Sequence, residues 1–184
     1  MPILAPEPSV FPEDLLDKLP SAEGDRCWWA VYTKSRQEKS LSRQLHALEV
    51  PYYLPLVPKV SLIKGRRMKS QLPLFGSYVF MYASDEERVH ALATDRIAHL
   101  FVAPDNDKIT RDLRKIRTLI ASGAPLTVES RLDAGRRVRV KNGSLMGLEG
   151  TVLARRGEDR LVVAVEFLQQ GVSVLISDFQ VEPI

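Results

Sequence analysis

The side chains best suited to chemistry do not form a catalytic set. Cys27 is the only cysteine, and no histidine stands at a spacing that indicates a catalytic dyad with it. The three histidines, His46, His90 and His99, lack metal-ligand spacing with paired carboxylates. Asp85-Glu86-Glu87 fits the first turn of a helix better than acid–base chemistry. We therefore expect no enzyme, no metal and no cofactor.

Charge is the second chemical signal, and it is unevenly distributed. The chain of 184 residues carries a net +3, but residues 1–25 hold six acids and one base, which leaves +8 for the rest. Between Glu49 and Asp85 there is no acid, and the cations there are Lys59, Lys64, Arg66, Arg67 and Lys69. A basic body favours a polyanion such as nucleic acid as partner, although an ordinary basic surface explains the charge equally well.

One stretch, Leu72 to Tyr82, is the most apolar and aromatic of the chain. A half-exposed strand alternates apolar with polar residues, whereas this run is apolar on both faces. One face must enter the core of its own domain. The other needs a cover, which is either a helix of this chain or another protein.

The elements that position these residues begin after an acidic, proline-rich leader. We expect the leader, residues 1–27, to be mostly mobile, with a short helix within 12–19. The aromatic and β-branched residues of 28–33 predict a strand. Ser35 and Glu38 then fit a capping box at the start of the first helix.

The following segment predicts an α+β domain over 28–121. Lys64 to Arg67 is typical of a β-hairpin tip, and Ser84 with Glu87 fits a second capping box. An apolar strand over 97–103 follows, and Thr110 is predicted to cap a third helix. This order indicates an antiparallel sheet with packed helices.

The remaining chain is all-β in character. Small and proline residues over 122–132 predict a linker, and short strand runs with glycine turns predict a small barrel over 133–184. Asn142-Gly143, Gly157 and Gln170-Gly171 are the expected turns.

These two blocks, in this order, resemble the NusG family of transcription elongation factors. The first carries Leu74-Phe75-Gly76-Ser77-Tyr78-Val79-Phe80, similar to the family's Leu-Phe-Pro-Gly-Tyr-Val-Phe run. The second resembles a KOW module, through Gly135-x-x-Val138-x-Val140-x-x-Gly143-x-x-x-Gly147-x-x-Gly150-x-Val152. The resemblance covers about residues 28–184. It implies a NusG N-terminal-type domain joined to a KOW barrel.

Two departures from the family pattern point to a specialised member. Gly76-Ser77 replaces the usual Pro-Gly, and Ser144-Leu145 replaces the Pro-Phe of housekeeping members. With the acidic leader, these departures suggest an RfaH-like antiterminator that acts on selected operons.

The resemblance implies that the N-terminal domain docks aromatic residues on the clamp coiled coil of the largest catalytic RNA polymerase subunit. The matching positions are Tyr32, Phe75 and Tyr78. Core packing is the alternative for each. Phe75 and Tyr78 have opposite parity, so a regular strand cannot present both on one face. Either the chain bends at Gly76-Ser77 or Phe75 belongs to the preceding loop.

The resemblance also implies that cations contact DNA of the transcription bubble, mainly at phosphates. Lys34 and Arg96 match positions that touch DNA in RfaH-like proteins, and Arg43 and His46 are expected neighbours on the first helix. The hairpin adds Lys64, Arg66 and Arg67. The alternatives are a solvated helix face and an edge strand kept soluble by charge.

The KOW module is expected to recruit a second partner, either the termination factor Rho or a small-subunit ribosomal protein. Its glycines Gly143, Gly147 and Gly150 are predicted at positive φ or in bulges. Its β-branched strands favour a stable barrel with no fold switch. An RNA-binding or ribosome-associated KOW protein is the alternative function. The single Cys27 fits a reducing cytoplasm, and neither a membrane span nor a secretory signal is visible in the sequence. We expect a cytoplasmic protein and a monomer.

Overall fold

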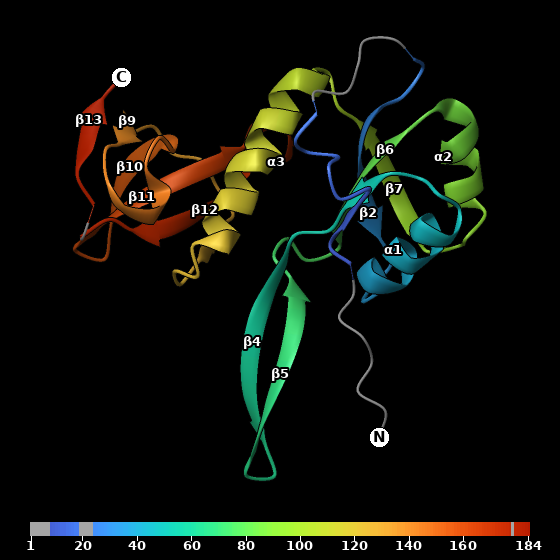
Figure 1. Ribbon diagram of the computed structural model, residues 1–184, viewed down its shortest axis with the longest axis horizontal. Helices are drawn as coiled ribbons and strands as arrows, with labels where there is room; N and C mark the ends of the chain where they lie inside the picture. The colour runs from blue at the N-terminus through green and yellow to red at the C-terminus, as the bar shows by residue number, and fades with distance from the viewer. Residues whose placement is uncertain (1–7, 19–23, 178) are drawn as a thin grey trace. The chain divides into compact units, whose positions relative to one another are not determined.

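The computed structural model describes residues 8–18, 24–177 and 179–184, and the chain divides into two units, Met1–Asn106 and Asp107–Ile184. Each unit is built around its own antiparallel sheet (Figure 1). No helix in the described ranges is long and apolar enough to cross a membrane. The predicted α+β block followed by an all-β block is confirmed.

A five-stranded sheet forms the first unit, in the order β1-β3-β6-β2-β7. Its strands are β1 (Val10–Phe11), β2 (Cys27–Thr33), β3 (Tyr52–Tyr53), β6 (Tyr78–Ala83) and β7 (Ile97–Val102). Two helices, α1 (Glu38–Ala47) and α2 (Asp85–Leu92), lie beside this sheet in Figure 1. Every strand pairing in it is antiparallel.

The core of this unit lies between α1 and one face of the sheet. Val31 of β2 and Met81 of β6 are fully buried and pack in one cluster with Leu41 and Leu45 of α1. On β2 and β6 the residues of opposite parity point to the other face, where the Trp28 and Tyr82 rings lie 5.4 Å apart. The central strands are therefore apolar on both faces, as the sequence predicts.

The leader is partly integrated into the sheet, which corrects the expectation that it is mobile. β1 pairs with β3, and the backbone N–H of Leu54 donates to the carbonyl oxygen of Ser9 over 2.6 Å. Leu15 and Leu16 are buried. Hydrogen-bonded turns, and not a helix, occupy the described residues 12–18, while Leu19 lies outside the described residues.

The two predicted capping boxes differ in outcome. Ser84 and Glu87 form the expected box at α2, since the Ser84 hydroxyl accepts from the Glu87 N–H and the Glu87 carboxylate accepts from the Ser84 N–H. The Ser35–Glu38 box is wrong: α1 begins at Glu38, with Gln37 as a cap that makes no side-chain hydrogen bond. Glu38 is instead used in a long-range contact.

A two-stranded ribbon, β4 (Leu56–Ile63) and β5 (Arg66–Pro73), projects from the first unit (Figure 1). Lys64 and Gly65 form its turn, both at positive φ, +49° and +75°. A two-residue turn with both φ values positive matches the twist of the flanking strands. The predicted hairpin tip is confirmed, and we call residues 56–73 the arm.

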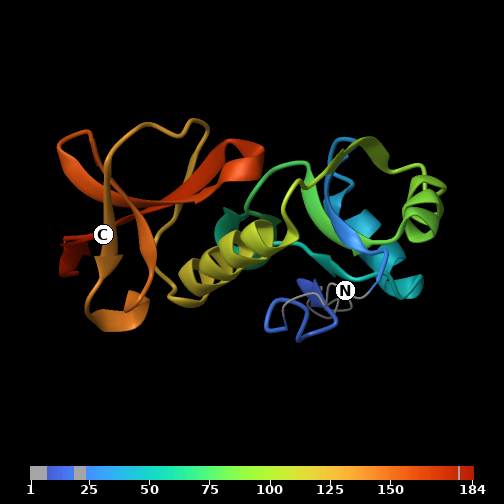
Figure 2. The same cartoon turned by 90° about the horizontal axis from the view of Figure 1, so that it is seen from above.

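A six-stranded antiparallel sheet forms the second unit, in the order β13-β9-β10-β11-β12-β8. Its strands are β8 (Thr127–Glu129), β9 (Arg136–Val140), β10 (Glu149–Arg155), β11 (Glu158–Val165), β12 (Gln170–Leu175) and β13 (Val181–Pro183), with short 3₁₀ turns η1 (Gly143–Leu145) and η2 (Glu166–Leu168). Figure 2 shows these strands curving around one another. β8 lies inside the predicted linker 122–132 and pairs with β12.

Two of the three turns that the sequence predicts in this sheet lie at the predicted residues. Gly157, at φ +80°, turns between β10 and β11, and Gly143 opens η1. The third turn is displaced: Gln169, at φ +53°, supplies the left-handed residue, and Gln170 already begins β12.

The third helix, α3 (Asn106–Ala121), begins four residues before the predicted cap. Thr110 is fully buried inside the helix, which corrects its assignment as the cap. Asn106 instead accepts a hydrogen bond from the Trp28 N–H through its side chain. The predicted apolar stripe is present, with Leu113, Ile116 and Leu119 fully buried.

Candidate functional site

Aromatic side chains gather on one face of the first sheet, across three neighbouring strands. Tyr32 of β2 pairs in register with Tyr78 of β6 and with His99 of β7. The Tyr32 ring lies 5.2 Å from the Tyr78 ring, edge to face, and 6.3 Å from the His99 ring. Phe101 follows two residues along β7, with its ring 6.4 Å from His99. We call Tyr32, Tyr78, His99 and Phe101 the aromatic strip.

The strip is open to solvent in the structure. Tyr32 is 38% exposed and Phe101 is 46% exposed, and His99 is also exposed. Tyr78 is half-buried, and this burial, with a smaller contribution from Tyr32, raises the pKa of its hydroxyl. Large exposed aromatic rings beside one another are typical of protein-binding surfaces.

Two members of the strip, His99 and Phe101, were not among the residues expected from the sequence. Their alternation along the apolar run 97–103 places them on one face of a strand. Which face that is depends on the pairing of β7 with β2, and the run itself does not encode this pairing.

Phe75 does not belong to this surface. It is 1% exposed, and its ring packs edge to face 6.2 Å from Phe80. The expectation that Phe75 anchors a partner therefore does not agree with its position. The residue belongs to a turn, since the Tyr78 N–H donates to the Phe75 carbonyl over 3.2 Å.

That turn resolves the opposite parity of Phe75 and Tyr78. Ser77 adopts φ +64°, the left-handed conformation that glycine usually takes in this kind of turn. Its N–H donates to the Glu38 carboxylate over 2.7 Å, and its carbonyl accepts from the Thr33 N–H over 2.8 Å. The bend turns Phe75 into the core and leaves Tyr78 on the strip.

Lys34 and Arg96 are close together at the end of the strip. The Lys34 N–H donates to the Arg96 carbonyl over 2.8 Å. Lys34 Nζ lies 2.6 Å from Asp95, which is 91% exposed, so this ion pair is worth about 0–1 kcal/mol. A phosphate can replace such a partner at small cost. The Lys34 hydrogen bond also lowers the pKa of the Asp95 carboxyl.

Arg96 is more firmly held. Its guanidinium donates to the Ser40 hydroxyl and to the Thr94 carbonyl, both over 2.6 Å. These bonds fix the side chain between the start of β7 and α1, and half-bury it.

The other two predicted cations of α1 occupy different surroundings. Arg43 and His46 are both exposed on the outer face of the helix. The His46 ring, however, lies 4.5 Å from the Phe11 ring of the leader and 6.4 Å from Tyr52. The leader therefore occupies part of the surface expected to face nucleic acid.

Lys64, Arg66 and Arg67 are exposed at the end of the arm, on a different element from Lys34, Arg43 and Arg96. The cations that the sequence predicts to bind nucleic acid therefore form two groups, which lie on different elements of the fold.

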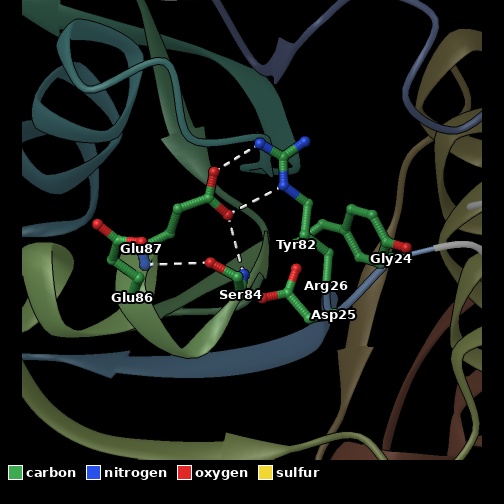
Figure 3. A pocket seen from close by; sticks show the side chains of 7 residues that line it. All are labelled: Gly24, Asp25, Arg26, Tyr82, Ser84, Glu86 and Glu87. Atoms are coloured by element: carbon green, nitrogen blue, oxygen red, sulfur yellow. Dashed lines mark hydrogen bonds and ion pairs between the residues drawn. The ribbon is translucent and has the colours of Figure 1, made fainter.

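A polar cavity of about 510 Å³ lies near the start of β2 (Figure 3). Arg26 binds Glu87 through two hydrogen bonds of 3.0 and 2.5 Å. Burial acts to raise the pKa of Glu87, but the Arg26 and Ser84 hydrogen bonds outweigh it and leave this pKa lowered. Because Glu87 is satisfied by the cap and by Arg26, we interpret the cluster as a structural support of α2. The described residues contain no group of side chains suited to a metal ion.

The three KOW glycines have two different roles in the second unit. Gly143 and Gly147 adopt φ values of +75° and +84°. The prediction of positive φ or a bulge is wrong for Gly150, which lacks positive φ and pairs with Val138 in regular register; a Cβ there would instead lie 2.6 Å from the Val162 carbonyl oxygen. The glycine lets β10 approach β11 closely.

Comparison with known proteins shows the family of the chain. No curated protein matches it. The family model described as transcription termination factor nusG matches residues 26–131, more than half of the 184 residues. The matched range includes the aromatic strip, the turn at Ser77 and the arm. Members of this family are transcription factors and not enzymes. The chain belongs to the NusG family.

Proposed function

We propose that this protein is a transcription elongation and antitermination factor that binds RNA polymerase through the aromatic strip. The observation that carries the proposal is the exposed pair Tyr32 and Tyr78, extended by His99 and Phe101. Membership of the NusG family implies an RNA polymerase partner.

The strip suits a helical partner such as the clamp coiled coil of the largest catalytic subunit. An amphipathic helix inserts apolar side chains at spacings of three and four residues into a surface of this kind. The four rings provide the apolar walls, and the tyrosine hydroxyls remain available to polar groups at the rim. Buried aromatic anchors account for most of the affinity in such contacts.

Nucleic acid of the transcription bubble is the second proposed partner of the first unit. Lys34 supports this proposal, because its ion pair with Asp95 is exposed and weak. Arg43 lies on the outer face of α1, and Arg96 adjoins Lys34. Contacts of these residues with phosphates are expected to be independent of sequence and sensitive to salt.

The second unit is proposed to act as a KOW module that recruits Rho or a small-subunit ribosomal protein. Its antiparallel strands and the glycines Gly143, Gly147 and Gly150 support the KOW interpretation. We propose a specialised, RfaH-like role in the cytoplasm as a monomer, which the departures at Gly76-Ser77 and Ser144-Leu145 support.

The test is capture of RNA polymerase from the source organism by the tagged full chain. Tyr32→Ala and Tyr78→Ala are each expected to weaken binding by about 2 kcal/mol, roughly 30-fold, as truncation of a central anchor does. Leu92→Ala is the matched control, since it removes an exposed apolar side chain, 42% exposed, from α2.

Circular dichroism of each variant checks that the fold is retained. Unchanged polymerase capture by both tyrosine variants would refute the proposed interface. Capture of ribosomal particles without polymerase would favour a ribosome-associated KOW protein instead.

A further inference from the structure

Apart from Leu56, which is buried in the core of the first unit, the arm lies outside that core. Among the residues that the structure describes, its two strands pair only with each other and belong to neither larger sheet. From Pro58 to Gln71 each residue is exposed except Ser61, which is half-exposed. Figure 1 shows the arm extending away from the five-stranded sheet. An isolated hairpin is only marginally stable in water, so a long exposed one indicates a surface kept for a partner.

The charge of the arm identifies the class of partner. Its five cations, with no acid among residues 50–84, are Lys59, Lys64, Arg66, Arg67 and Lys69. None of these cations forms an ion pair with any residue in the described parts of the chain. Uncompensated positive charge of this density attracts a polyanion.

The register divides these cations between both faces of the arm. Arg67 lies opposite Leu62, and Lys69 lies opposite Val60, so these two side chains share one face. Arg66 lies opposite Ile63, and Lys59 opposite Ser70, on the other face. A flat polyanionic surface would contact only one of these faces. Two facing walls of phosphate would contact both.

The arm also has the dimensions of a groove-binding element. Strands of eight residues extend about 26 Å at roughly 3.3 Å per residue. The major groove of B-form DNA is about 12 Å wide and admits a two-stranded ribbon, with phosphates along both sides. The exposed apolar residues Leu62 and Ile63, 73% and 55% exposed, share the faces of Arg67 and Arg66 and so lie beside the cations at the end of the arm.

We infer that the arm inserts into the major groove of duplex DNA, with Arg67 and Lys69 directed to one phosphate wall and Lys59 and Arg66 to the other. The inference rests on the proposed function and specifies that the nucleic acid bound by the arm is double-stranded. An A-form RNA duplex is excluded as the preferred ligand, because its major groove is deep and narrow. A single strand lacks the second wall.

The experiment measures binding of the full chain to a labelled DNA duplex of about 20 base pairs, with the matching single strand and RNA duplex as competitors, over about 50 to 300 mM salt. Arg66→Ala/Arg67→Ala removes two charges from the arm. Arg136→Ala/Arg137→Ala is the matched control, because it removes two adjacent exposed arginines from β9. Lys59→Ala/Lys69→Ala is a second arm variant.

Each arm variant is expected to lower affinity for duplex DNA at least about tenfold and to reduce the slope of log K against log salt by about two. The control is expected to keep both values near those of the wild type. Equal losses in arm and control variants would overturn the inference, since they indicate general charge attraction. Equal affinity for duplex, single strand and RNA duplex would also overturn it.

Polymerase capture separates this inference from the proposed function. Arm variants are expected to capture polymerase as the wild type does, because the aromatic strip is intact. If the wild type captures polymerase and the arm variants bind duplex DNA as tightly as the wild type, the inference alone is rejected. Duplex binding through the arm without polymerase capture by the wild type would reject the proposed function alone.

Discussion

The carboxylate of Glu38, at the first residue of α1, accepts a hydrogen bond of 2.7 Å from the backbone N–H of Ser77, 39 residues later in the chain. This contact holds the turn that separates buried Phe75 from half-buried Tyr78. It therefore links the start of a helix to the geometry of the aromatic strip.

Glu38→Ala is expected to lower the free energy of unfolding by about 1.5 to 3 kcal/mol, the usual worth of a hydrogen bond to a charged group. Polymerase affinity should fall as well, because Tyr78 loses its support. Thermal and urea unfolding measure the first effect. Glu86→Ala, which removes an exposed acid from the first turn of α2, is the control. Equal stability of Glu38→Ala and wild type would show that the bond does not maintain the turn.

Ser77→Gly is expected to raise the free energy of unfolding by about 0.5 to 1 kcal/mol. Ser77 has φ +64°, where a side chain costs about 1 to 2 kcal/mol and glycine costs little, although glycine adds entropy to the unfolded chain. Ser35→Gly is the comparison, since Ser35 is exposed and does not have positive φ. A loss of stability in Ser77→Gly equal to that in Ser35→Gly would contradict the strain argument.

Removal of residues 1–18 is expected to increase amide exchange at Leu54, whose N–H donates to the Ser9 carbonyl. Leu16→Ala should lower the free energy of unfolding by about 2 to 5 kcal/mol, because Leu16 is fully buried. Val89→Ala, a truncation at a position 53% exposed, provides the control for thermal unfolding. Unchanged exchange at Leu54 after truncation would show that β1 does not protect the sheet edge in solution.

Phe101→Ala is expected to weaken polymerase binding by about 1 to 2 kcal/mol without a loss of fold, since the side chain is 46% exposed and lies at the end of the strip. Binding titrations compare it with Leu92→Ala on α2. If Phe101→Ala binds as tightly as the control, the polymerase-binding surface does not extend beyond His99.

Asp112→Asn is expected to stabilise the protein at neutral pH. Burial raises the pKa of Asp112, with the Glu166 N–H hydrogen bond as a partial offset, so the folded state holds this proton more tightly than the unfolded state does. The stability that the wild-type protein gains from protonated Asp112 is complete below the unfolded pKa of this carboxyl and is lost as the pH rises through its folded pKa. The asparagine carbonyl retains an acceptor for the Glu166 N–H.

The free energies of unfolding of Asp112→Asn and wild type, measured between acidic and neutral pH, test the direction of this effect. The higher free energy of unfolding of Asp112→Asn should be present at neutral pH and disappear in strong acid, where the wild-type carboxyl is protonated. Asp159→Asn, at an exposed position of β11, is the control. A gain that is independent of pH would rule out the titration of Asp112 as its cause.

The amino-acid sequence by itself determined the features that depend on a few neighbouring residues. Ser84 and Glu87 form a capping box because both partners lie within one turn of a helix. Lys64 and Gly65 form the arm's turn because a two-residue loop between strands requires positive φ. The apolar stripe of α3 and the all-β character of residues 127–183 follow from periodicity in the same way.

Tertiary structure alone decided which aromatic residues are exposed. Phe75 and Tyr78 look equivalent in sequence, but the turn held by Glu38 buries the first. His99 and Phe101 join Tyr32 only because β7 pairs with β2 in one register. Val10 and Phe11 of the leader form a strand because β3 offers them an unpaired edge. These outcomes depend on contacts between residues distant in sequence, and burial is set by the partner strands, which local propensity does not encode.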